Sequence, residues 1–94
     1  MRQRARAKTG FVYGENREVF KVTLLTPKKE LYVGLALKVV LPTEDGQITV
    51  LEFHQPLLTR LQRGIISIDD RWLFNVRDGI ARISGFELMG IVQT

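Results

Sequence analysis

The chain has no cysteine and only one histidine, His54, among its 94 residues. Disulfide bonds and thiolate catalysis are therefore excluded, and so are zinc or iron–sulfur sites built on cysteine. A metal site built on several histidines is excluded for the same reason. The absence of cysteine is consistent with a reducing compartment.

Long apolar segments are also missing. The longest apolar run covers residues 35–41 and is interrupted by Lys38, whereas a membrane helix needs about 20 apolar residues. No apolar stretch follows Arg2, Arg4 and Arg6 in the manner of a secretory signal. We therefore expect the chain to reach a membrane only through a partner.

Catalytic signatures are scarce. No glycine pattern matches a phosphate-binding loop or a dinucleotide fingerprint, and no serine stands in a Gly-x-Ser-x-Gly elbow. The adjacent acids Glu44-Asp45 and Asp69-Asp70 fall in predicted turns, where acidic side chains bond the local backbone. We predict no enzymatic activity, no cofactor and no metal site.

The net charge of +4 is concentrated in a short N-terminal tail. Residues 1–8 carry four basic side chains and no acid, whereas the remaining residues carry ten of each sign. Such a tail suits an acidic lipid surface or nucleic acid, but a solvated terminus is the simpler interpretation. Transit peptides are also rich in arginine and poor in acids, although this tail is short and has no serine. The segment also contains Phe11, Val12 and Tyr13, which could form an extra edge strand.

The chain does contain a series of short apolar and β-branched runs separated by turn signals. Residues 20–25 alternate apolar and polar side chains, which is typical of a half-buried strand. Further strands are predicted at residues 31–33, 36–41, 47–51, 57–61, 64–68, 71–76, 80–83 and 86–92. Residues 57–62 could instead form one helical turn, but no window sustains the periodicity of an amphipathic helix.

Turn residues bound these runs. Pro42 opens a polar loop whose Asp45-Gly46 pair suits the positive φ of a tight hairpin, residues 77–79 form a turn, and Ser84-Gly85 another. Regular short strands with such turns indicate a sandwich or barrel. We predict an all-β, two-sheet β-sandwich of about 8–10 short strands over residues 20–94, preceded by a basic extension over residues 1–19.

Four aromatic residues are candidates for the core. Phe20, Trp72, Phe74 and Phe86 fall in predicted strands with apolar neighbours two positions away, so we interpret all four as core residues. Core aromatics cannot stack on bases, and the body has no net charge. A small basic β-barrel that binds nucleic acid is therefore the weaker hypothesis. For His54 two interpretations remain: a loop residue that bonds nearby backbone, or an interface residue.

Four segments stand out together: residues 22–34 (VTLLTP, then YVG), 39–46 (VVLPTEDG), 54–61 (HQPLLTRL) and 74–81 (FNVRDGIA). In this order and spacing, over residues 20–92, they resemble the N-terminal β-sandwich of the epsilon subunit of F-type ATP synthases. The resemblance implies a non-catalytic subunit of the central stalk that couples gamma to the c-ring in proton- or ion-driven ATP synthesis. It also implies a peripheral position on the cytoplasmic face of a bacterial inner membrane, rather than in an organelle.

The resemblance further implies an interface with gamma and the c-ring, with no nucleic acid and with membrane contact only through the c-ring. The family's acidic loop and His-x-Pro loop, with a threonine just beyond, correspond here to Glu44, Asp45, Gly46, Gln47, His54, Gln55, Pro56 and Thr59. The family usually has glycine where Thr49 stands and Pro-Gly where Glu52-Phe53 stand, which alters the loop before His54. Long members continue into a helical hairpin, so a sequence ending at Thr94 implies a connector without inhibitory or nucleotide-binding activity.

Overall fold

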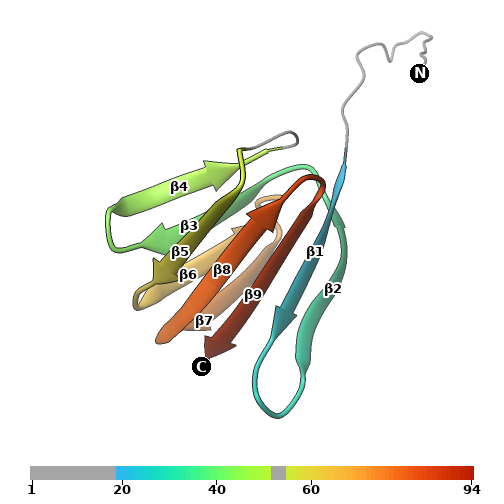
Figure 1. Ribbon diagram of the computed structural model, residues 1–94. Helices are drawn as coiled ribbons and strands as arrows, with labels where there is room; N and C mark the ends of the chain where they lie inside the picture. Colours follow the sequence, from blue (N-terminus) through green and yellow to red (C-terminus); the bar gives the residue numbers. More distant parts are fainter. Residues whose placement is uncertain (1–18, 52–54) are drawn as a thin grey trace, which may run out of the picture.

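The computed structural model describes residues 19–51 and 55–94, and within these ranges it contains nine β-strands and no helix (Figure 1). The strands are β1 (Phe20–Leu25), β2 (Glu30–Ala36), β3 (Val39–Thr43), β4 (Gly46–Val50), β5 (Leu57–Leu61), β6 (Gly64–Ile68), β7 (Trp72–Val76), β8 (Asp78–Ser84) and β9 (Glu87–Gln93). The all-β prediction is confirmed, and residues 57–61 form a strand rather than a helical turn. The N-terminal extension, with Phe11 to Tyr13, lies outside the described residues except for Val19.

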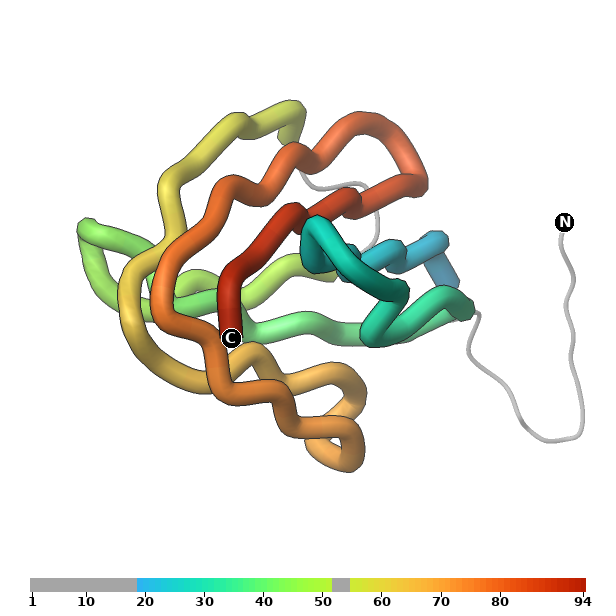
Figure 2. Tube along the Cα trace, turned by 90° about the horizontal axis from the view of Figure 1, so that it is seen from below, coloured from blue at the N-terminus to red at the C-terminus, as the bar shows by residue number. Residues whose placement is uncertain are grey.

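Hydrogen bonds join the strands into one sheet that curls into two layers. The strand order is β2-β1-β9-β8-β5-β3-β6-β7, and β4 pairs with β3. β5 and β3 share a single residue pair, Thr43 with Leu61, so the sheet bends sharply there. One layer consists of β2, β1, β9, β8 and β5, and the other of β4, β3, β6 and β7 (Figures 1 and 2). The predicted two-sheet sandwich is thus one continuous sheet folded over its own core.

Pro42 lies at this bend, inside β3 and not in the loop that the sequence predicted. On one side β3 pairs with β6 at Val39 and Val40 and with β5 at Thr43. Pro42 therefore occupies the break between the two ladders, where a missing N–H costs little. Its carbonyl accepts the N–H of Gln62 at 2.9 Å. A Cβ at Gly64 would lie 2.7 Å from the Cβ of Pro42, so this corner requires glycine.

The core fills the space between the two layers. Its buried apolar side chains are Phe20, Val22, Leu24, Ala36, Val39, Leu41, Val50, Leu61, Ile66, Ile68, Val76, Ala81, Ile83, Leu88 and Val92. Phe20 is buried as predicted, and Phe74 packs against the core. The core prediction is wrong for Trp72 and Phe86, which are each 48% exposed. Trp72 begins the edge strand β7, and Phe86 lies in the turn between β8 and β9.

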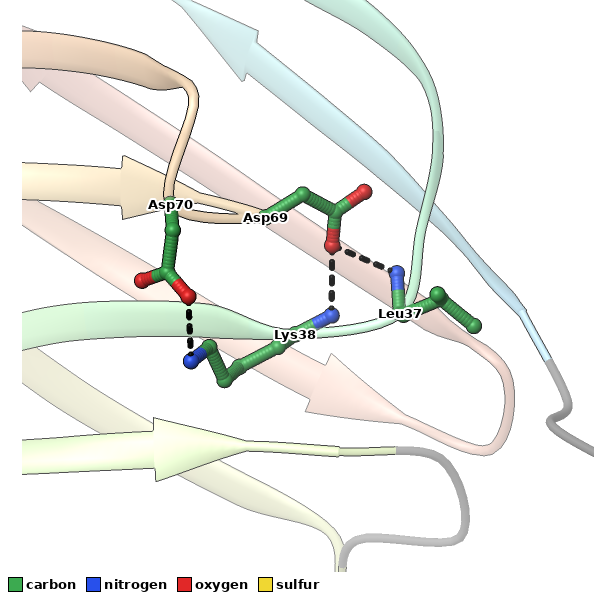
Figure 3. A network of polar contacts seen from close by, with 4 residues as sticks. All are labelled: Leu37, Lys38, Asp69 and Asp70. Atoms are coloured by element: carbon green, nitrogen blue, oxygen red, sulfur yellow. Dashed lines mark hydrogen bonds and ion pairs between the residues drawn. The ribbon is translucent and has the colours of Figure 1, made fainter.

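A bend between β2 and β3 carries the chain from one layer to the other, so the strand predicted over residues 36–41 is interrupted. The bend is fastened to the β6–β7 turn (Figure 3). The Asp69 Oδ1 atom accepts the backbone N–H groups of Leu37 at 2.8 Å and of Lys38 at 2.9 Å. The Asp70 Oδ2 atom lies 2.7 Å from the Lys38 Nζ atom. The interpretation of Asp69-Asp70 as turn residues is therefore confirmed, and both adopt positive φ, 54° and 55°.

Candidate partner-binding surfaces

The first candidate surface is the acidic turn between β3 and β4. The Thr43 hydroxyl donates to the Gly46 carbonyl at 2.6 Å and accepts the Asp45 N–H at 3.2 Å. Gly46 has a φ of 106°, which few other residues tolerate. Threonine and glycine thus fix the turn, and Glu44 and Asp45 are exposed at its tip.

Arg60 links this turn to the neighbouring corner of the sandwich. Its Nε atom lies 3.8 Å from Glu44 Oε2 and 3.8 Å from Asp78 Oδ1. All three side chains are exposed, and such ion pairs contribute about 1 kcal/mol or less. Asp45 shares the turn with Glu44, so the tip of this turn carries two carboxylates. Arg63 and Arg77 lie in the nearby β5–β6 and β7–β8 turns, so the negative charge is local to the tip.

The residues predicted as one interface separate into two groups. Gln55 and Pro56 are exposed and directly precede β5, whereas Glu44 lies beside Arg60 near the far end of that strand. Five extended residues span roughly 17 Å. Thr59 lies between the groups and is half-buried opposite Ala81. His54 and the departures at Glu52-Phe53 lie outside the described residues.

A second candidate surface is the outward side of the layer formed by β2, β1, β9, β8 and β5, here called the outer face. Its exposed apolar side chains are Val33, Leu35, Leu58, Ile80, Met89 and Ile91. Leu58 is 70% exposed, and Ile80 and Ile91, which are paired across β8 and β9, are each 54% exposed. Ile91 also lies opposite Leu25 of β1, so an apolar group extends over three strands here. An exposed apolar group of this kind often marks an interaction site.

The outer face contains two hollows. An open groove of about 630 Å³ is lined by residues that include Pro27, Thr59, Ile80 and Ile91. A hollow of about 320 Å³ lies beside Pro56, with Leu58 and Arg82 in its wall. The predicted residues Pro56 and Thr59 therefore border the outer face.

The outward side of the other layer has no exposed apolar pair like that of Ile80 and Ile91 among the described residues. Ile65 and Leu73 are exposed there, but their cross-strand partners on β7 and β6 are Asn75 and Ser67. The apolar side chains alternate with polar ones, which is ordinary for a solvated sheet face. This face offers a natural control for experiments on the outer face.

Other kinds of site are not found in the part of the chain that the structure describes. Residues 19–51 and 55–94 contain no group of three potential metal ligands. The same residues contain no helix long and apolar enough to cross a membrane.

Sequence reasoning missed the outer face, although a signal was present. Residues 88–92 read Leu-Met-Gly-Ile-Val without a polar side chain. A strand with one solvated face alternates, whereas a strand covered on both faces is apolar throughout. In β9 the inward residues Leu88 and Val92 are buried, and the outward residues Met89 and Ile91 are exposed.

Comparison with known proteins gives one consistent family. A family model described as "ATP synthase, Delta/Epsilon chain, beta-sandwich domain" matches residues 19–92. "ATP synthase epsilon chain 2" of Ralstonia nicotianae is 35% identical over 77 residues, which are 78% of this chain and 55% of that protein. The chloroplastic ATP synthase epsilon chain of Pisum sativum is 37% identical over 76 residues, 78% of this chain and 56% of that protein. The chain thus spans about half the length of these relatives.

Solved structures share the fold at low sequence identity. A chain in the central stalk/c-ring structure of the Tetrahymena thermophila mitochondrial ATP synthase has a TM-score of 0.69 at 18% identity, covering 85% of this chain and 67% of that one. A chain in the Euglena gracilis mitochondrial ATP synthase structure of OSCP, F1 and c-ring has a TM-score of 0.74 at 14% identity, covering 96% and 60%.

Proposed function

This chain belongs to the family of ATP synthase delta/epsilon-chain β-sandwich domains, and from that premise we propose that it is a non-catalytic subunit of the central stalk of an F-type ATP synthase. In this role it connects gamma to the c-ring and transmits rotation during ion-driven ATP synthesis. It lies at the membrane through the c-ring, on the cytoplasmic face of a bacterial inner membrane.

The observation that carries the proposal is the apolar outer face. Leu58, Ile80 and Ile91 are more than half exposed in the isolated chain, although they would gain free energy from burial. A rotor connector must form a lasting interface with its neighbour, and lasting interfaces have an apolar centre. We assign the outer face, bordered by Pro56 and Thr59, to gamma, with Gln55 at the margin of that interface. The interface role of His54, which lies outside the described residues, stays a prediction.

A connector also needs a second surface that is separate from the first. The turn formed by Glu44 and Asp45, with Gly46 and Gln47 at the start of β4, provides an exposed corner that carries two carboxylates at its tip. Polar and basic loops on a neighbouring subunit would complement it. We assign this corner to the polar loops of the c-ring.

The test of the gamma assignment is co-purification of the chain with its gamma subunit. The wild type should form a one-to-one complex. Ile80→Glu and Ile91→Glu should abolish it, because each places a charge in the apolar centre of the interface. Leu73→Glu, at a comparably exposed apolar position of the opposite layer, is the matched control and should bind like the wild type. If the two outer-face variants bind gamma as well as Leu73→Glu does, the assignment is wrong.

A further inference from the structure

Arg82 lies within the outer face, near its border at Pro56, with a strand on either side. It points outward from β8, with Leu58 of β5 on one side and Met89 of β9 on the other. Ile80 precedes it on the outward side of the same strand. Arg82 thus has apolar residues at three of its neighbouring positions in the sheet. Lysine and acidic residues are depleted at the centre of an interface, but arginine is enriched there.

No carboxylate of the described residues compensates this charge. Every acidic oxygen among residues 19–51 and 55–94 lies beyond 4 Å from the Arg82 guanidinium, whereas Arg60 has two carboxylates at 3.8 Å. The nearest acidic position on β9 is Glu87, which pairs across the sheet with Ser84. Arg82 instead lines the 320 Å³ hollow with Pro56 and Leu57.

Covering the outer face with a purely apolar surface would leave this charge buried and unpaired. Arginine does not lose its proton in proteins, so it cannot become neutral on burial. A buried charge is tolerated when it is paired and hydrogen-bonded. The planar guanidinium matches the two oxygens of a carboxylate better than any other side chain does.

We propose that the partner surface covering the outer face carries a carboxylate that pairs with Arg82 in the hollow beside Pro56. This pair fixes the register of the sandwich on its partner, because the apolar contacts around it are non-directional. The inference rests on the proposed function in one respect, namely that a protein partner covers this face.

The first test is the dissociation constant of the complex with gamma for the wild type, Arg82→Met and Arg82→Lys. Arg82→Met should bind at least about tenfold more weakly, because it leaves the partner's carboxylate buried without its cation. Arg82→Lys keeps the charge and should lose less. Arg63→Met, at the exposed corner between β5 and β6, is the matched control and should be unchanged. Melting curves of the free variants check that each is folded.

The second test identifies the carboxylate directly. In the complex of the Arg82→Lys variant, a carbodiimide converts a nearby carboxylate into an O-acylisourea. The lysine amine attacks its acyl carbon, and the bond to the urea oxygen breaks. The urea leaves, and an amide bond links the two chains. The expected result is a cross-linked peptide joining position 82 to an Asp or Glu of gamma. Replacing that acid by its amide should then weaken binding of the wild type as much as Arg82→Met does.

The outcomes separate this inference from the proposed function. If the wild type does not bind gamma, both fail together. If Ile80→Glu abolishes binding but Arg82→Met binds as tightly as the wild type or more tightly, the outer face is the interface and the paired carboxylate is wrong. Cross-links that arise elsewhere on the chain and never from position 82 would overturn it as well.

Discussion

The rings of Tyr32 and Trp72, which belong to the two edge strands β2 and β7, lie with their centroids 6.4 Å apart and their planes at 49°. Phe74 adds a second contact to Tyr32 at 6.3 Å, nearly edge-on. No ladder joins β2 to β7, so aromatic contacts close the sandwich where hydrogen bonds do not. A Cβ at Gly34 would lie 3.2 Å from the Tyr32 hydroxyl, so glycine leaves room for the ring to fold over β2.

The Tyr32–Trp72 contact should therefore contribute to stability. Because Trp72 is half exposed, Trp72→Ala should lower the free energy of unfolding by about 1–2 kcal/mol, less than the roughly 3–5 kcal/mol of a buried tryptophan. A double-mutant cycle with Tyr32→Ala in urea should give a coupling of about 0.5–1.5 kcal/mol. Strictly additive effects would show that the two rings do not interact.

The Asp69 carboxylate should be needed to hold the β2–β3 bend. Asp69→Gly removes the acceptor of two backbone N–H groups and should cost about 2 kcal/mol in chemical denaturation. Glycine is used because Asp69, like Asp70, has a positive φ, which alanine would strain. Asp70→Gly is the control. It loses an exposed ion pair with Lys38 but relieves a positive φ, so we expect a change of less than about 1 kcal/mol. Equal losses in both variants would contradict the assignment.

The close approach of β8 and β9 should make Gly79 sensitive to a single methyl group. A Cβ there would lie 2.7 Å from the Ile91 carbonyl oxygen, a backbone atom held in the sheet. Gly79→Ala should cost about 2–3 kcal/mol. Gly90→Ala should cost less, since its Cβ would meet the movable Leu24 side chain at 2.8 Å. Thermal melts compare the two, and the reverse order would refute the packing argument.

The acidic turn should matter for coupling and not for stability. Glu44→Gln with Asp45→Asn leaves the Thr43 and Gly46 contacts of the turn in place, so the melting temperature should hardly change. In the assembled enzyme, ATP-driven ion transport should fall relative to ATP hydrolysis, because the proposed charged contact to the c-ring would be lost. Asp70→Asn, on a turn at the other end of the sandwich, is the control. Undiminished transport in the double variant would contradict the assignment of this turn to the c-ring interface.

Sequence patterns captured the strands better than the surfaces. Alternation in residues 20–25 correctly predicted a half-buried strand, whose buried face includes Val22 and Leu24. The pattern of apolar residues failed for Trp72. This residue begins an edge strand, and alternation does not indicate whether the end of an edge strand is covered by other residues. Pro42 was misplaced because the break in the ladder beside it depends on how β5 turns into β6, which no local pattern encodes.

The candidate site was predicted only in part for a similar reason. The resemblance supplied Glu44 and Asp45, which the structure places in an exposed turn, and Thr59, which borders the outer face. It did not bring forward Arg82 or Ile80. Their significance depends on which strands lie side by side, and β5 lies beside β8 only in the folded sheet.

Because the chain contains no cysteine, single cysteines can report which face gamma covers. Ile80→Cys and Leu73→Cys are comparably exposed positions on the two layers, and their maleimide labelling rates can be followed by mass spectrometry of this chain, free and in complex with gamma. We predict that complex formation slows labelling of Ile80→Cys at least about tenfold, as expected for a buried interface centre, and leaves Leu73→Cys unchanged. Protection of Leu73→Cys together with free labelling of Ile80→Cys would contradict the assignment of the outer face to gamma.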